Sequence, residues 1–535
     1  MRMPELKYSS RKTEAEIDVM RGLNFGNALR DGDMADCLNI SARKYPYLSV
    51  CRDRAAVVKR DEEITGCTAL TQFRGSLVYV VGTDIYYDGE SVGTVTAGAK
   101  KFAAVNTKLC IFPDKKYIDF GDMENIELCD LGADTGTFEV YVIVGSGVPQ
   151  EIRVYSGGTA IAFSDYFKAG DVIKVVPDDA TTYADYAKEV TVSSIKEYGG
   201  GVEGIILDGA PFSAIADFSG KLVREIPDLD FICESGNRLW GVCNTDRTVY
   251  ASALGDPTNF HIYQGLSTDS YAVAVGTDGD FTAICSLGSS VLCFKEAYIH
   301  KVLGSYPAEY SVTTYNAEGV GYNCYKSLVN IGETVFYIGA HGDVYAYSGS
   351  TPRLVSPTFG EVDLSAGVAG TDGERYYLSC KVDNATTYDM FVYDLKYGIW
   401  TREDETHAVD FTRIGNECYF AGSDGKVYRM DAAEPASDKD WLVRYTPFYE
   451  TVKGRKCHSA LIIRLELPKG SYACVHVSRD RGPWTLCGTL KGGTRDAVSM
   501  RLPIGRCDRF ELKLSGEGAC TLLSILREMH IGSEV

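Results

Sequence analysis

The stretch Phe231–Ala253, FICESGNRLWGVCNTDRTVYASA, contains a short apolar strand, a glycine turn, a stronger apolar strand, a second turn and an aromatic strand. The same order recurs four more times, as FTAICSLGSSVLCFKEAYIHKV from Phe281, SLVNIGETVFYIGAHGDVYAYSG from Ser327, GVAGTDGERYYLSC with MFVYDLKYGIW from Gly367, and VDFTRIGNECYFAGSDGKVYRMD from Val409. The turn glycines, Gly236, Gly288, Gly332, Gly373 and Gly415, are 52, 44, 41 and 42 residues apart. Such a period, with three or four strands in each unit, is typical of β-propeller blades.

Two earlier stretches fit the same pattern more loosely. They are TALTQFRGSLVYVVGTDIYYDG from Thr68 and FAAVNTKLCIFPDKKYIDF from Phe102. A single meander cannot bury both faces of its sheet, whereas blades stacked around an axis cover one another. We therefore predict a propeller of about seven blades. An ordinary sandwich of hairpins is the alternative that the pattern leaves open.

Outside the repeats the chain divides into further parts. From Asp130 to Arg224 the alternation remains that of β-strands but changes phase, in FEVYVIV, EIRVYSGG, AGDVIKVV and EVTVSSIKEYGGGVEGIILDG. After the linker Ala432–Asp440, residues to Val535 alternate cleanly. The fold class is therefore all-β, with an extended N-terminal arm over 1–66, propeller blades over 67–129 and 225–432, an inserted small β-domain, expected as a compact barrel, over 130–224, and a C-terminal antiparallel β-sandwich over 438–535.

Composition narrows the class of protein. The 535 residues carry a net charge of −19, with 35 Tyr and 55 Gly, which favour strands and tight turns. An acidic chain is unsuited to gripping nucleic acid through its phosphates, although DNA could pass through an acidic channel without sticking. The 17 cysteines show no metal spacing and are expected to be reduced and buried. We find no signal peptide and no membrane-spanning run.

Motifs for catalysis are missing from the sequence. It contains no G-x-S-x-G, H-E-x-x-H or P-loop pattern, and the histidines are dispersed and are expected in loops or on the surface. They are His261, His300, His341, His407, His458, His476 and His530. We therefore predict that the chain is not an enzyme and assign no catalytic, cofactor-binding or metal-binding residue, and no cofactor.

Three stretches carry a resemblance to a known family. They are LNISARKYPYLSVCRDR (Leu38–Arg54), GNRLWGVCNTDRTVYASALGDPTNF (Gly236–Phe260) and VFYIGAHGDVYAYSGSTPRLVS (Val335–Ser356). They resemble the tail nozzle, or tail-stabilisation, proteins of tailed bacteriophages. The resemblance extends over roughly residues 36–120 and 230–430, and is weaker in the inserted domain and the C-terminal sandwich.

The resemblance implies a structural virion protein that forms a ring, a hexamer, around the DNA exit channel below the portal. Its implied partners are further copies of itself, the portal or adaptor, other tail proteins, and DNA that passes without specific binding. The implied location is the virion tail, after synthesis in the cytoplasm of the bacterial host. The family brings no catalytic residues to this chain.

Two other functions remain open. A receptor-binding or carbohydrate-binding propeller of a phage tail would need an exposed aromatic platform, for which Tyr472 and Trp484 in the sandwich are the candidates. A propeller glycoside hydrolase would need two close carboxylates in a deep pocket. The segment Ser478–Trp484 is similar to the Asp-box hairpin of sialidases, but it is one residue short, and a plain hairpin explains it.

Overall fold

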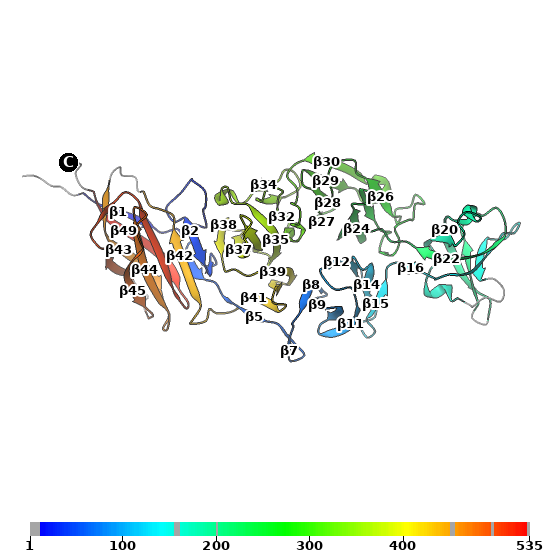
Figure 1. Cartoon of the computed structure of the whole chain (residues 1–535), viewed down its shortest axis with the longest axis horizontal. Helices are drawn as coiled ribbons and strands as arrows, with labels where there is room; N and C mark the ends of the chain where they lie inside the picture. The colour runs from blue at the N-terminus through cyan, green and yellow to red at the C-terminus, as the bar shows by residue number, and fades with distance from the viewer. Residues whose placement is uncertain (1–10, 155–160, 200–201, 450–454, 494–496, 532–535) are drawn as a thin grey trace, which may run out of the picture. The chain divides into compact units, whose positions relative to one another are not determined.

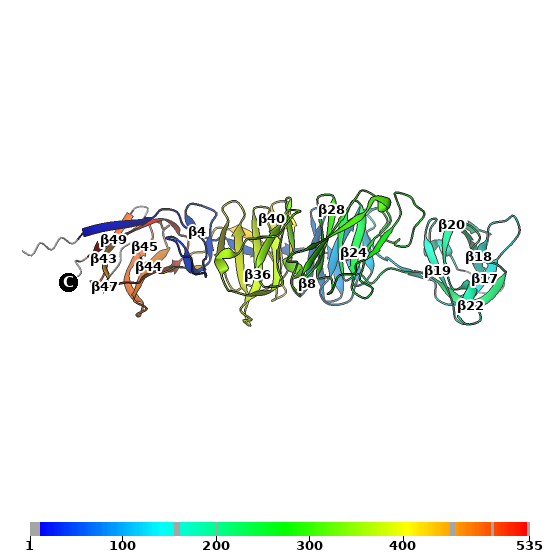
Figure 2. The ribbon, with the colours of Figure 1, turned by 90° about the horizontal axis from the view of Figure 1, so that it is seen from above.

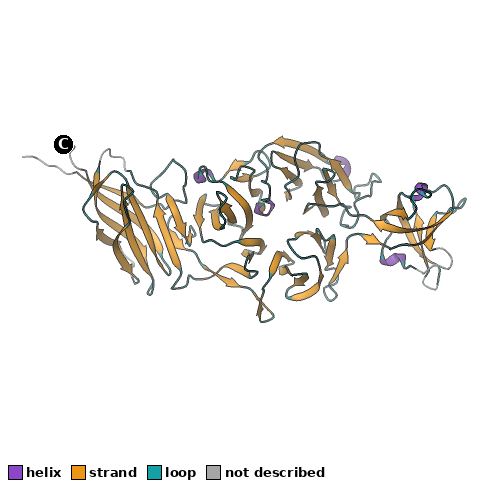
Figure 3. Ribbon diagram, viewed as in Figure 1, coloured by secondary structure: helices purple, strands orange, loops and turns teal. Residues whose placement is uncertain are grey.

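The protein consists almost entirely of β-strands. The structure, a computed structural model, describes residues 11–154, 161–199, 202–449, 455–493 and 497–531. In these residues the helical segments are five 3-10 turns of three residues each. Figure 3 draws helices in purple among the orange strands. None of the described helices is long and apolar enough to cross a membrane.

Seven four-stranded antiparallel sheets follow one another in the described part of the chain (Figure 1). They form the β-propeller that the repeat predicts. The sheets are β8–β11 (Cys67–Phe73, Ser76–Val81, Asp84–Tyr87, Glu90–Thr94), β12–β15 (Lys101–Val105, Lys108–Phe112, Lys116–Asp119, Glu127–Asp130), β23–β26 (Phe231–Ser235, Arg238–Cys243, Thr248–Ala251, Tyr271–Ala274), β27–β30 (Ala283–Leu287, Ser290–Lys295, Tyr298–Leu303, Ser311–Asn316), β31–β34 (Val329–Ile331, Thr334–Ile338, Val344–Tyr347, Arg353–Leu354), β35–β38 (Leu364–Thr371, Arg375–Val382, Asp389–Asp394, Ile399–Arg402) and β39–β41 with β5 (Ala408–Ile414, Glu417–Gly422, Val427–Ala433, Asp53–Ala56).

The quoted repeat shows why each blade forms. Ser235 pairs with Arg238 across the β23–β24 turn, and the two turn residues Gly236 and Asn237 have φ of 60° and 59°, as tight hairpins require. Blades then cover one another, since Trp240 and Val249 of one sheet share a buried cluster with Val291 of the next. Regular spacing of the glycine turns thus reflects blades stacked face to face.

Contacts group the chain into two compact units, Met1–Val81 with Val320–Val535, and Gly82–Gly319. The first unit holds the sandwich, whose two sheets are visible from above in Figure 2. One sheet has the order β3-β4-β49-β43-β46, with β1 also paired to β49 and β47 to β43, and the other has the order β2-β42-β48-β44-β45. The C-terminal strands are β42 (Asp440–Tyr445), β43 (Lys456–Glu466), β44 (Tyr472–Arg479), β45 (Thr485–Lys491), β46 (Ala497–Arg501), β47 (Arg506–Cys507), β48 (Phe510–Glu517) and β49 (Thr521–Ile531).

The N-terminal segment differs from the extended arm expected over residues 1–66. Its strands β1 (Arg11–Ile17), β2 (Met34–Leu38), β3 (Ile40–Ser41) and β4 (Leu48–Val50) complete both sheets of the sandwich, and β5 is the fourth strand of the last blade. Residues 1–10 lie outside the described part. The strands are short and mixed in polarity, so their partners, some 400 residues later, could not be read from local alternation.

Arg54, on β5, is one of the polar links between this segment and the last two blades. Its guanidinium lies 2.8 Å from Glu403 and 3.0 Å from Asp404, and the side chain of Glu403 is only 7% exposed. Arg54 also lies over the ring of Phe420, at 5.2 Å from the centroid. Although burial opposes its charge, these carboxylates raise the pKa of Arg54, so the guanidinium stays charged.

The second unit holds a six-stranded barrel inserted between two blades. It contains β17 (Phe138–Ile143), β18 (Glu151–Val154), β19 (Val172–Pro177), β20 (Glu189–Glu197), β21 (Glu203–Leu207) and β22 (Ala216–Arg224). The sheet closes because β22 pairs with both β17 and β19. Alternate residues such as Val140, Val142 and Ile173 fill the interior. A two-residue strand, β16 (Ala133–Asp134), pairs with the end of β22 where the chain enters and leaves the barrel.

We expect Arg54→Ala to destabilise the protein strongly. Removing the guanidinium leaves the buried Glu403 without its partner, and the expected loss is roughly 3 kcal/mol. Arg52→Ala is the matched control, because the pair of Arg52 with Glu434 is exposed and its loss should cost less than about 1 kcal/mol. Chemical denaturation of both variants measures the difference, and equal midpoints would contradict the role given to Arg54.

Candidate functional site

The last residues of the stretch Gly236–Phe260 form a polar junction between the third blade and the barrel. Asp256 accepts hydrogen bonds from the Thr258 hydroxyl at 2.6 Å and from Asn259 Nδ2 at 2.7 Å. The ammonium of Lys168, which belongs to the barrel, lies 2.8 Å from the same carboxylate. Although burial opposes ionisation, Lys168 and Thr258 lower the pKa of Asp256, so it stays charged.

A buried ion pair completes this junction. Asp171 of the barrel is fully buried and accepts from Arg224 Nη1 at 2.6 Å, while Asn259 Nδ2 donates to its other oxygen at 3.0 Å. Arg224 Nη2 also donates to the main-chain oxygen of Leu131, at the entrance to the barrel. The motif Asp-Pro-Thr-Asn-Phe therefore has a structural role, because its polar side chains bind the barrel to the third blade.

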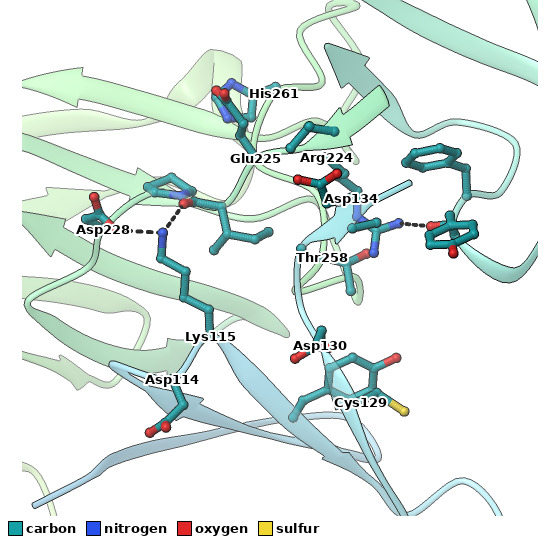
Figure 4. Close-up of a pocket in the computed structure, with 18 of the residues that line it drawn as sticks. Asp114, Lys115, Cys129, Asp130, Asp134, Arg224, Glu225, Asp228, Thr258 and His261 are labelled. Carbon is teal, nitrogen blue, oxygen red and sulfur yellow. Dashed lines mark hydrogen bonds and ion pairs between the residues drawn. The ribbon is translucent and has the colours of Figure 1, made fainter. Parts of the chain in front are cut away.

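A cleft of about 1170 Å³ opens beside this junction, as Figure 4 shows. It is bounded by the second blade, the barrel and the third blade. Polar and aromatic side chains line it, among them Lys108, Asp114, Lys115, Tyr117, Asp130, Asp134, Asp165, Tyr166, Glu225, Asp228, Asp246, Tyr250, Thr258 and His261. Its size and lining are suited to a polar ligand or to a segment of another protein.

Most carboxylates of this cleft are neutralised by a lysine. Lys115 Nζ lies 2.6 Å from Asp228 and donates to the main-chain oxygen of Ile226, as Figure 4 shows. Asp134 pairs with Lys221 and Glu225 with Lys174 in the same way. Despite partial burial, the pKa of Asp134 is lowered by Lys221. A lowered pKa favours a permanently charged binding surface, whereas a general acid needs a raised one.

A second polar cavity, of about 580 Å³, lies in the first unit between the last two blades and the N-terminal segment. Asp372 and Asp431 both line it, and each has an oxygen 3.0 Å from the hydroxyl of Tyr377. The two oxygens therefore lie no more than about 6 Å apart, a limit that is compatible with the roughly 5 to 5.5 Å between the paired carboxyl groups of retaining glycosidases. Arg43 and Arg413 reach the same cavity.

The charge state of this pair follows from its neighbours. Burial opposes ionisation of Asp372, but the main-chain N–H of Glu374 and the charge of Arg375 lower its pKa. Arg43 pairs with Asp431, whose φ of 52° lies in the left-handed region beside a bulge between β41 and β5. Strained backbone of this kind occurs at functional sites, where it directs a side chain.

Asp410 is the only described carboxyl group whose pKa is clearly raised. Burial raises the pKa, and Lys326 Nζ at 3.4 Å opposes the shift. Asp410 lies on β39 and accepts from the main-chain N–H of Leu70 on β8, while Lys326 donates to the Val409 carbonyl. These bonds join the segment before β31 to the last blade and to the first strand of the first blade.

Of the residues that the sequence singled out, His261 lines the cleft, whereas Tyr472 and Trp484 lie apart from both cavities. In the sandwich, Tyr472 donates to Glu517, and the Lys513 ammonium lies over the Trp484 ring, so neither side chain forms an open platform. The prediction of loop or surface histidines is wrong for His300 and His458, which are fully buried. His300 is held between two threonine hydroxyls, an environment that local sequence does not reveal.

The described residues contain no group of three or more His, Cys, Asp or Glu able to hold a metal ion. Sequence reasoning missed Asp372, Asp431 and Asp171, because acidic residues in turns are common and only their spatial neighbours distinguish them. The one available indication was the Asp-Pro-Thr-Asn-Phe motif, which contains three residues of the barrel junction, Asp256, Thr258 and Asn259.

Comparison with known proteins gives distant likenesses. No family model and no curated protein matches the chain. Among solved structures, it is similar to exo-β-1,3-galactanase from Phanerochaete chrysosporium with β-1,3-galactotriose, at 9% identity over 54% of this chain and 92% of that chain, with a TM-score of 0.22. It is also similar to the computationally designed Ika8 protein, at 10% identity over 70% of this chain and 99% of that chain, with a TM-score of 0.30.

The prediction that this chain is not an enzyme is contradicted by these comparisons, because a similar structure is that of a galactanase. We withdraw it. With a TM-score of 0.22, however, the likeness brings no activity or substrate to this chain.

We expect Asp171→Ala to loosen the barrel from its blade. The variant leaves the guanidinium of Arg224, only 10% exposed, without a carboxylate, which should cost roughly 3 kcal/mol. Limited proteolysis should then cut faster at the two connections to the barrel. Lys221→Ala, which removes an exposed pair with Asp134, serves as the control and should leave the cleavage rate unchanged. Unaltered cleavage of Asp171→Ala would contradict the proposed junction.

Proposed function

We propose that this chain is a structural component of a bacteriophage tail that forms a ring around the DNA exit channel. One observation carries the proposal: two of the stretches that resemble tail nozzle proteins supply joints of the fold. Leu38–Arg54 contains β4, the first two residues of β5 and the largely buried Arg54, and Gly236–Phe260 contains residues of the junction with the barrel. Residues that hold parts of a protein rigidly together are suited to a scaffold.

The charge of the chain supports the same function. A net charge of −19 disfavours binding to phosphates, so DNA could move past the ring without adhering to it. The partners in this proposal are further copies of the chain in a hexamer, the portal or adaptor, and other tail proteins. The chain would act in the virion tail after synthesis in the host cytoplasm.

Particle size tests this proposal. The purified chain, alone and mixed with the portal protein of the same phage, should form closed rings whose mass is a multiple of 58.5 kDa. Mass photometry gives the copy number, and negative-stain microscopy gives the shape. A chain that stays monomeric under both conditions, at micromolar concentration and low salt, would contradict the ring.

A glycoside hydrolase is the second candidate, and the Asp372–Asp431 pair favours it. In this function the ionised Asp372 would act as nucleophile, Asp431 as the partner carboxyl group, and the arginines of the cavity would bind polar groups of a sugar. A carbohydrate-binding propeller would use the same cavity without turnover.

Sugar release from a defined oligosaccharide panel tests this candidate. Asp372→Asn and Asp431→Asn should each lower turnover by at least about a hundredfold, because both carboxyl groups take part in the reaction. Glu434→Gln, at a side chain that is 81% exposed and outside the cavity, should leave it unchanged. Binding without turnover would favour the carbohydrate-binding propeller. If the protein neither binds nor cleaves any sugar of the panel, the glycoside hydrolase and the carbohydrate-binding propeller are both contradicted.

A further inference from the structure

One long connection in the third blade exposes large apolar side chains. Between β25 and β26 the chain runs through Ser252–Ser270, here named the blade loop. Leu254, Tyr263 and Leu266 in it are 45%, 57% and 56% exposed. Single exposed apolar residues need no explanation, but three within thirteen residues of one loop form a local concentration.

The blade loop is held rigidly by a buried arginine. Arg238, in the motif Gly-Asn-Arg-Leu-Trp, is 1% exposed, and its guanidinium donates to the main-chain oxygens of Ser252 at 2.8 Å and Ser267 at 2.6 Å, and also to that of Asp269. No carboxylate pairs with it among these contacts. A cation buried against three carbonyls of one loop serves to fix the conformation of that loop.

A second set of bonds shapes the tip of the loop. The buried carboxylate of Asp269 accepts from the main-chain N–H groups of Gln264, Gly265 and Leu266. The N–H of Leu254 donates to the Thr268 carbonyl at 2.9 Å, which brings the two halves of the loop together. The apolar side chains are therefore carried by an ordered backbone. A partner that binds them needs to order the loop little further, so the loss of conformational entropy is small.

The blade loop also carries few charged side chains, and those it has are paired. Its sequence SALGDPTNFHIYQGLSTDS contains no Lys, Arg or Glu. Its two acids are both engaged, Asp256 with Lys168 and Asp269 with the main chain. In a chain of net charge −19, two copies repel each other over most of their surface. A neutral, apolar surface is where such copies can approach.

We propose that the blade loop is one half of the contact between neighbouring copies of this chain. This inference rests on the proposed ring and names its interface. A closed ring needs heterologous contacts, in which the blade loop of one copy meets a different surface of the next. Tyr263 and Leu266 insert into that surface, and Arg238 keeps the loop in the shape that fits it.

Two charge substitutions test the interface. Tyr263→Glu combined with Leu266→Glu should raise the concentration needed for half-assembly by about a hundredfold, because apolar contacts at the centre of an interface contribute most of its affinity. Val58→Glu is the control. Val58 is 53% exposed, on the two-stranded hairpin β6 (Val58–Lys59) and β7 (Glu62–Glu63), so this control places one negative charge at an exposed apolar residue elsewhere.

Assembly is measured by mass photometry over a dilution series, and folding by circular dichroism and thermal unfolding. Tyr263→Ser with Leu266→Ser is a milder variant that keeps the test valid if the charged variant misfolds, and it should also weaken assembly. If a folded variant still forms rings at the same concentration, the blade loop is not the interface, and the proposal of a ring stands. Monomeric wild-type protein would instead overturn the ring, and the interface with it.

Discussion

The pairing of β5 with β41 is the constraint on which the architecture depends. The last blade takes three strands from residues 408–433 and its fourth from residues 53–56. Without this strand, β41 would be an open edge, with unpaired N–H and C=O groups exposed. The same segment continues backward into the sandwich, so one stretch of backbone holds the last blade and the sandwich together. The largely buried Arg54 adds a charge contact to this main-chain pairing.

Three largely buried arginines join parts of this structure. Arg224 and Asp171 seat the barrel, Arg54 and Glu403 hold the N-terminal segment, and Arg238 shapes the blade loop. A buried charge is costly to desolvate, so each is retained with two or more partners that fix its geometry. Apolar packing between blades has little directionality and would tolerate small shifts of one blade against the next. A guanidinium that donates to several fixed oxygens does not tolerate such shifts. The joints therefore give the fold its precision.

Ring formation and carbohydrate chemistry place different demands on the same scaffold. A ring depends on outward surfaces such as the blade loop, whereas a glycosidase depends on the cavity that contains Asp372 and Asp431. The two lie in different units of the chain, the loop within Gly82–Gly319 and the cavity in the other. A virion protein with both features would combine assembly with recognition of a surface glycan.

The sequence alone was sufficient for the all-β class, the propeller, the inserted β-domain and the C-terminal sandwich. Glycine turns such as Gly236 and alternation along each strand are local properties, and local chemistry determines them. Only the tertiary structure decided that Asp53–Ala56 closes the last blade and that Asp372 meets Asp431 beside Tyr377. These pairs join residues far apart in the chain, and nothing in a short stretch of sequence records which distant edge or hydroxyl a polar side chain will reach. Identical acids on other turns remain exposed, so their position in space alone gives these residues their roles.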